Sequence, residues 1–146
     1  MKIFFITPKF NLRNISGSIV EYDLMIRDLQ KLGHEVVVIT TLSECNDIPF
    51  PTPYKIIEKN IGSRRLLGIQ RGVFKILKEY ESTADFFYVD GQVFLYGAGL
   101  YRRLGGKIPV SAYFNRELVC WPDGEAGRAG SRWSAYSFRR CGRYIY

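Results

Sequence analysis

The sequence predicts an α/β protein with a Rossmann-like, doubly wound parallel sheet and helices on both faces. Short, almost continuously apolar runs recur along the chain, as in strands that are covered on both sides. Amphipathic segments of helical period separate these runs. A glycine stands in the loop between the first run and the first amphipathic segment. This alternation is typical of strand–helix–strand units, whose parallel strands are joined right-handedly.

The first such unit covers residues 1–41. Two apolar, β-branched runs predict strands at Lys2–Thr7 and Glu35–Thr40. Between them, Ser18 and Glu21 have the spacing of a capping box at a helix start. Gly33 stands where the C-terminal end of that helix needs a left-handed residue.

Three further strands and three further helices follow. The strands are expected at Lys55–Asn60, which is weak and near an edge, at Asp85–Asp90 and at Pro109–Phe114. One helix starts at about Arg64, one follows Gly91–Tyr96 and ends at Gly105-Gly106, and one begins at Trp133. The first of these has apolar residues available for its buried side: Leu67, Phe74, Ile76, Leu77 and Tyr80.

The expected strand order is 3-2-1-4-5. This order reverses between the first and fourth strands, so a ligand crevice is expected beyond their carboxyl ends. The loops that follow the first, fourth and fifth strands would line it.

Composition sets the broad class of the protein. A chain of 146 residues with 47% hydrophobic residues can form one globular domain. Its longest apolar runs are too short to span a bilayer, and its start shows no signal-peptide pattern. Three scattered cysteines give neither a metal motif nor a disulfide framework, which favours a cytoplasmic location. The single histidine, His34, excludes a histidine-rich metal site.

The net positive charge of +7 lies entirely in the second part of the chain. Residues 1–63 carry seven basic and seven acidic residues, whereas residues 64–146 carry fourteen basic and seven acidic ones. A basic half can meet a sugar-nucleotide phosphate, anionic lipid or nucleic acid, or it can simply be a basic surface. A structural role without ligand binding is expected for Arg102, Arg103 and Lys107, since they stand at a predicted helix end and complement the helix dipole.

The loop before the first helix is a candidate phosphate site. Gly17 would let backbone amides at the positive end of the helix approach a ligand, although one glycine can also serve a turn alone. The dinucleotide fingerprint G-x-G-x-x-G and the P-loop motif are both absent. Nicotinamide enzymes and P-loop nucleotidases therefore fit poorly.

Polar residues follow the fourth and fifth predicted strands. Asp90-Gly91 is either a turn or a substrate contact. Asn115, Arg116 and Glu117 offer a bidentate cation and a hydroxyl acceptor, or a simple surface ion pair.

A basic and aromatic segment ends the sequence. It combines arginines with aromatic residues between Arg128 and Tyr146, but no nucleic-acid-binding module is present. An amphipathic segment that contacts a membrane surface or packs on a domain fits better than nucleic-acid binding.

Three stretches in order resemble the N-terminal domain of GT-B glycosyltransferases of the family-4-like group. LQKLGHEVVVIT (Leu29–Thr40), after the small-residue loop Ser16-Gly17-Ser18, resembles the family's LxxxGHEVxVIT. ADFFYVDG (Ala84–Gly91) and GKIPVSAYF (Gly106–Phe114) resemble its xDxVHxHG and gxPvVxTxH segments. The likeness covers about residues 1–117. It departs from the family in two places, where the usual Gly-Gly is Ser16-Gly17 and the HD-like position is Phe114-Asn115.

The resemblance implies a retaining hexosyltransferase in glycan biosynthesis. It would use a nucleotide-sugar donor, a saccharide or lipid-linked acceptor, and neither a metal nor a further cofactor. The family pattern places the donor diphosphate at Ser16 and Gly17. It places the acceptor at Asp90, Gly91, Asn115, Arg116 and Glu117, and it assigns no catalytic residue. The resemblance also implies that the donor phosphate itself takes the acceptor proton.

The same resemblance predicts residues 1–146 to be a truncated acceptor-side domain that lacks the C-terminal donor-binding domain and is inactive alone. Peripheral contact with a membrane would suit a lipid-linked acceptor. Two alternatives stay open. One is a stand-alone sugar- or phosphate-binding module or partner subunit without catalysis, and the other is a scaffold domain without a ligand.

Overall fold

The fold comes from a computed structural model, which describes residues 1–13, 17–41, 46–48, 51–61, 65–91 and 94–113. The helix predicted from Trp133 lies outside these residues. The described residues form the strands β1 (Lys2–Thr7), β2 (Glu35–Thr40), β3 (Lys55–Glu58), β4 (Phe86–Asp90) and β5 (Val110–Tyr113), and the helices α1 (Gly17–Lys31), α2 (Leu66–Tyr80) and α3 (Leu95–Arg103). No helix in this part of the chain has the length and hydropathy that a bilayer span requires.

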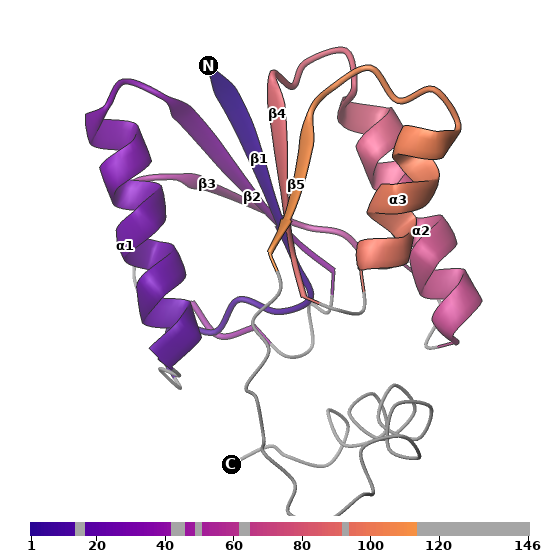
Figure 1. Ribbon diagram of the computed structural model, residues 1–146. Helices are drawn as coiled ribbons and strands as arrows, with labels where there is room; N and C mark the ends of the chain where they lie inside the picture. The colour runs from indigo at the N-terminus through magenta and orange to yellow at the C-terminus, as the bar shows by residue number, and fades with distance from the viewer. Residues whose placement is uncertain (14–16, 42–45, 49–50, 62–64, 92–93, 114–146) are drawn as a thin grey trace, which may run out of the picture. The chain divides into compact units, whose positions relative to one another are not determined.

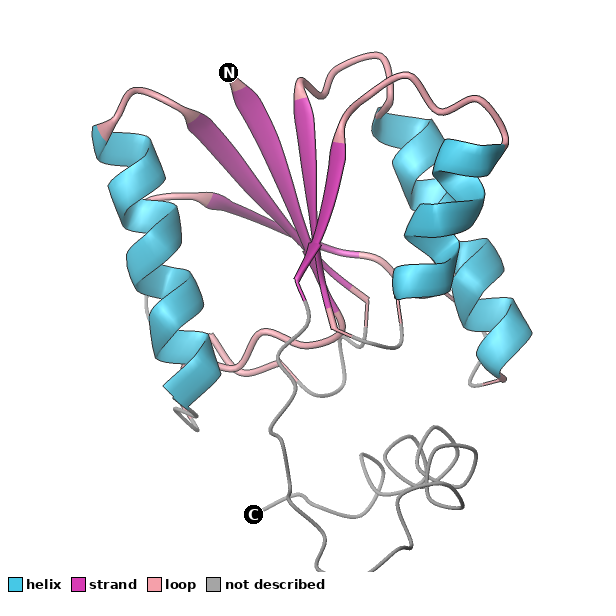
Figure 2. Ribbon diagram, in the orientation of Figure 1, coloured by secondary structure: helices cyan, strands magenta, loops and turns pink. Residues whose placement is uncertain are grey.

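The strands form one parallel sheet in the order β3-β2-β1-β4-β5, which confirms the predicted Rossmann-like topology. Figure 2 shows the strands as a single twisted layer between helices. β1 is central and pairs with β2 from Lys2↔Glu35 to Thr7↔Thr40 and with β4 from Ile3↔Phe86 to Ile6↔Val89. The weak third strand lies at an edge, as predicted.

Helices cover both faces of the sheet, with α1 on one side and α2 and α3 on the other (Figure 1). On the α1 side, Phe5 contacts the rings of Tyr22 and Tyr88, with centroids 5.1 and 4.9 Å away. On the opposite side, Phe4 contacts the ring of Tyr80 at 4.8 Å. Alternate residues of β1 therefore serve two cores, which explains its continuous apolar run.

Two helices end in the same backbone motif. At the end of α1, the Gly33 amide donates to the Gln30 carbonyl and the His34 amide to that of Leu29, at 2.9 and 3.1 Å. Gly33 has a φ of +83°, so the predicted left-handed position is confirmed. Gly105 ends α3 in the same way with a φ of +79°.

Some boundary predictions are wrong. α1 begins at Gly17, so Ser18 lies in its first turn and is not the residue that precedes the helix. Leu67 is 84% exposed, because the buried stripe of α2 passes through Ile69, Val73 and Leu77, and Leu67 projects from another side of the helix. β3 is two residues shorter than expected, ending at Glu58.

Glu81 connects α2, α3 and the approach to β5. Its Oε1 accepts hydrogen bonds from the Tyr101 hydroxyl and the Lys107 amide, both at 2.8 Å, and Oε2 accepts one from Lys78 Nζ at 2.9 Å. The Tyr101 hydroxyl in turn accepts from the Ile108 amide at 3.1 Å. The Lys107 amide, then Lys78 and Tyr101, lower the pKa of Glu81 to about 2.

Gly106 and Gly99 form a pair for testing how tightly α3 is packed. A Cβ on Gly106 would lie 2.3 Å from the Tyr101 ring, whereas a Cβ on Gly99 would meet nothing within 4 Å. We expect Gly106→Ala to destabilise the fold by about 1–3 kcal/mol through overpacking. Gly99→Ala should stabilise it by up to about 1 kcal/mol through helix propensity. Urea unfolding measures both, and equal midpoints for the two variants would contradict the packing at Gly106.

The contribution of the Glu81 charge to stability should depend on pH, and replacing the residue tests this. The pKa of Glu81 is lower in the folded state than the value of about 4.3 in unfolded chains. Its ionised form therefore stabilises the fold above about pH 4.3, and this contribution is lost as the pH falls toward about 2. We expect Glu81→Gln to be less stable than the unmodified chain at neutral pH, with a gap that narrows on acidification. Urea unfolding of both proteins across this range checks the prediction, and a gap independent of pH would contradict it.

Candidate functional site

The carboxyl ends of β1 and β4 meet at the centre of the sheet. These strands are neighbours, but the chain leaves β1 for α1 on one face and β4 for α3 on the other. This divergence of the two connections is the feature that places ligand sites in doubly wound sheets. In Figure 1, α1 begins at the same end of the sheet at which β1 and β4 finish.

Asp90 is the half-buried carboxylate at this point. Its Oδ1 accepts a hydrogen bond from the Tyr22 hydroxyl at 2.6 Å, and its Oδ2 lies 3.1 Å from Thr7 Oγ1. The three residues belong to β4, α1 and β1. Asp90 therefore joins the helix that follows the first strand to both central strands.

The Thr7 hydroxyl has two possible acceptors but one proton. Thr7 Oγ1 also lies 3.0 Å from the Lys9 carbonyl oxygen, and a hydroxyl has only one proton to donate. If Asp90 is ionised, Thr7 donates to one of the two oxygens at a time. If Asp90 is protonated, it can donate to Thr7 while Thr7 donates to Lys9. The cluster thus accommodates both states of the carboxyl group.

Burial raises the pKa of Asp90 above its ordinary value. The hydrogen bonds from Tyr22 and Thr7 act in the opposite direction and stabilise the ionised form, but the loss of solvation is the larger effect. A carboxylate that is held at an energetic cost, at the end of a central strand, is a candidate for function.

Two of the predicted glycines belong to the segments that follow β4 and β1. Gly91 has a φ of +90°, a conformation that L side chains rarely adopt, and it turns the chain away from β4. Gly17 is the first residue of α1. Tyr22, which is five residues further along α1, contacts Asp90, so the first turns of this helix lie near the carboxylate. The amides at such a helix start favour an anion.

A second polar cluster lies at the end of β2. Asn46 Oδ1 accepts from the Phe10 amide at 2.7 Å and from Thr40 Oγ1 at 3.1 Å, and Asn46 Nδ2 donates to Glu58 Oε1 at 2.9 Å. These bonds join the loops after β1 and β2 to β3. Nearby in the chain, Thr41 is buried, and its Oγ1 has no hydrogen-bond partner among the described residues.

The structure places some of the predicted site residues together. Asp90 and Gly91 lie at the switch point, and Gly17 starts the helix that reaches Asp90 through Tyr22. Ser16, Asn115, Arg116 and Glu117 lie outside the described residues. Whether any of these seven residues binds a ligand stays a prediction.

Sequence reasoning missed Thr7 and Tyr22. For Thr7 the signal was present, because this residue continues the alternation of Ile3 and Phe5 toward the α1 side, and the strand register continues from Ile6↔Val89 to Thr7 and Asp90. The rotation of α1 that brings Tyr22 to the carboxylate cannot be derived from strand register alone.

A carboxylate flanked by two hydroxyl groups is suited to binding polyhydroxy ligands, since it accepts strong hydrogen bonds from hydroxyl donors. Among the described residues, no group of three or more His, Cys, Asp or Glu side chains is placed to hold a metal ion.

A comparison with models of known protein families finds no match for this chain. A comparison with curated proteins finds no significant match either.

Replacing Asp90 by asparagine should stabilise the protein at neutral pH. Because the pKa of Asp90 is raised in the folded state, its stabilising contribution is complete below the unfolded value of about 3.9 and declines as the pH rises through the folded value. Asparagine keeps an acceptor for Tyr22 and a donor for Thr7 but cannot ionise. We expect Asp90→Asn to be more stable than the unmodified chain at neutral pH, and this difference should vanish on acidification. Urea unfolding of both proteins measures it.

Glu81→Gln is the matched control for this experiment, since that carboxylate has a lowered pKa and its neutral variant should show the opposite sign. A loss of stability in Asp90→Asn at neutral pH would show that the ionised carboxylate supports the fold.

Proposed function

We propose that the chain is the acceptor-binding N-terminal domain of a retaining glycosyltransferase, which transfers a sugar from a nucleotide-sugar donor to a saccharide or lipid-linked acceptor. One observation carries the proposal: Asp90 lies at the switch point of the sheet, with Thr7 and Tyr22 on its two oxygens. The order of the family-like stretches in the sequence supports it.

The acceptor would be held by its hydroxyl groups. Each carboxylate oxygen can accept about two hydrogen bonds, so Asp90 keeps capacity after its bonds to Tyr22 and Thr7. The residue is only half-buried, which leaves the carboxylate within reach of a ligand. Tyr22 and Thr7 position Asp90 rather than bind the sugar in this proposal.

The donor diphosphate would approach the start of α1. Gly17 has no side chain to hinder that approach, and the amides of the first helical turn offer donors to phosphate oxygens. The same donors would stabilise charge that develops on the leaving diphosphate. The donor phosphate would take the acceptor proton, so Asp90 acts in binding and orientation.

Titration of the ¹⁵N-labelled chain with neutral saccharides and nucleotide sugars tests the proposal. We expect one class of saccharide to shift the amide signals of Thr7, Tyr22, Asp90 and Gly91. Asp90→Ala should weaken its binding by about 10- to 100-fold, since hydrogen bonds to a charged group are lost. The chain alone should release no sugar from any nucleotide sugar.

Asp28→Ala is the control, because Asp28 is an exposed carboxylate on α1 that pairs with Lys31. Saccharide binding that is indifferent to Asp90→Ala would contradict the acceptor site. Turnover of a nucleotide sugar by the 146-residue chain would contradict its assignment as an acceptor half. Binding of saccharide without transfer, even when a donor-binding domain is supplied, would favour a binding module over a transferase.

A further inference from the structure

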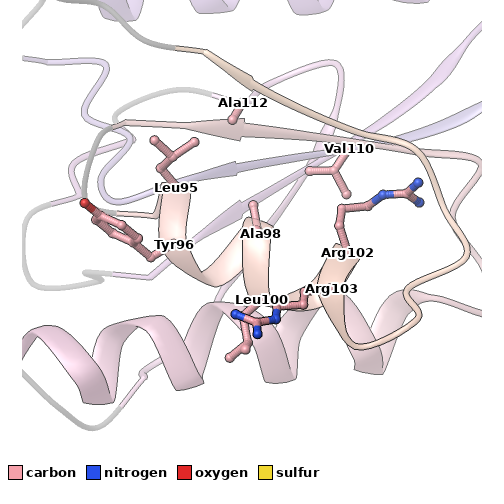
Figure 3. A pocket seen from close by; sticks show the side chains of 9 residues that line it. Leu95, Tyr96, Ala98, Leu100, Arg102, Arg103, Val110 and Ala112 are labelled. Carbon is pink, nitrogen blue, oxygen red and sulfur yellow. The ribbon is translucent and has the colours of Figure 1, made fainter.

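A cavity of about 540 Å³ lies between α3 and β5, and neither Asp90, Thr7 nor Tyr22 is among its lining residues. Figure 3 shows it from close by, with side chains of α3 and of β5 around it. Its lining residues are Leu95, Tyr96, Ala98, Gly99, Leu100, Arg102, Arg103, Val110 and Ala112. We call this feature the α3–β5 groove.

The groove is mainly apolar, and its lining residues are regularly spaced along α3 and β5. Leu95, Ala98 and Arg102 recur at helical intervals on α3, while Val110 and Ala112 are alternate residues of β5. Tyr96 and Leu100 on the adjacent side of the helix are 70% and 38% exposed. Apolar side chains of α3 are therefore partly exposed beside the edge strand β5.

The charged residues of the groove are both cationic. Arg102 Nη1 donates to the carbonyl oxygens of Gly106 and Ile108 at 2.9 and 3.4 Å, and these are neutral partners. Neither Arg102 nor Arg103 forms an ion pair with a carboxylate in the part of the chain that the structure describes. Among the described residues, these two positive charges beside the apolar surface therefore have no carboxylate partner.

The position of the groove favours a helical occupant. α2 and α3 lie side by side on this face of the sheet, and β5 is the edge strand of the described sheet (Figures 1 and 3). A helix in the groove would extend this layer across β5, with one apolar stripe to bury. A helix in a groove is a common mode of recognition, with anchors at i, i+3, i+4 and i+7.

We propose that the α3–β5 groove binds an amphipathic, acidic helix of a partner polypeptide. Its apolar stripe packs on Leu95, Leu100 and Val110, and its flanking carboxylates pair with Arg102 and Arg103. Charge complementarity selects this occupant over a second copy of the chain, because a symmetric dimer presents the same patch twice and brings a second pair of arginines to the contact.

Gly99 offers a way to fill the groove without disturbing the fold. A Cβ at this position meets nothing within 4 Å, so Gly99→Trp projects into the groove and not into the core. Arg103→Glu reverses one charge and leaves the backbone contacts of Arg102 in place. Arg71→Glu, at an exposed position of α2 outside the lining, is the matched control.

The probe is a fluorescein-labelled amphipathic peptide of about 14 residues with leucines at i, i+3, i+4 and i+7 and glutamates on both flanks. A second peptide carries lysines in place of the glutamates. Fluorescence anisotropy should show the acidic peptide binding about tenfold tighter or better than the basic one. Gly99→Trp should abolish this binding, Arg103→Glu should weaken it about tenfold, and Arg71→Glu should leave it unchanged.

Circular dichroism of each variant verifies that it is folded before binding is compared. Equal affinity for the two peptides, absence of binding to both, or unchanged binding by Gly99→Trp would overturn the proposal. Protection of Tyr96 from iodination in the protein alone would also overturn it, since the groove would then already be filled.

Discussion

The pairing of β1 with strands on both of its sides is the constraint on which the rest of the described fold depends. β1 is bonded to β2 along its whole length and to β4 over four residues. Its side chains alternate between two cores, with Phe5 toward α1 and Phe4 toward α2. Thr7, the last residue of β1, therefore lies beside the ends of both β2 and β4. The connections that follow β1 and β4 lead from this point to opposite faces of the sheet. The candidate site follows from this placement.

Two carboxylates show how differently the fold treats its acidic groups. Glu81 receives three donors, its pKa falls, and its charge supports the junction of α2, α3 and β5. Asp90 receives two, but burial outweighs them and its pKa rises. The ionised form of Glu81 thus stabilises the fold, whereas the ionised form of Asp90 destabilises it through the loss of solvation. Sequences that violate a stability rule at one position often do so where function requires it, which is why Asp90 is the stronger site candidate.

The sequence predicted what depends on local pattern and on topology. The apolar runs located the five strands, the reversal of their order located Asp90 and Gly91, and Gly33 followed from the end of a helix. The side-chain network was not predictable, because Tyr22 reaches Asp90 across 68 residues through the rotation of α1. The roles of Asn46 and Glu81 in the hydrogen-bond network were not predicted, for a related reason. Their partners lie on loops and helix ends whose spatial proximity no periodicity encodes.

The helix α3 links the proposed acceptor site to the proposed docking groove. Its approach begins beside Asp90, where the Phe94 amide donates to the Gly91 carbonyl at 3.1 Å, and its side lines the groove. It is also closely packed, since a Cβ on Gly97 would lie 2.8 Å from Val73, and the Gly97 amide donates to Gln70 Oε1 at 2.6 Å. These two contacts fix the position of α3 against α2. A partner bound in the groove would therefore be held at a set position relative to Asp90.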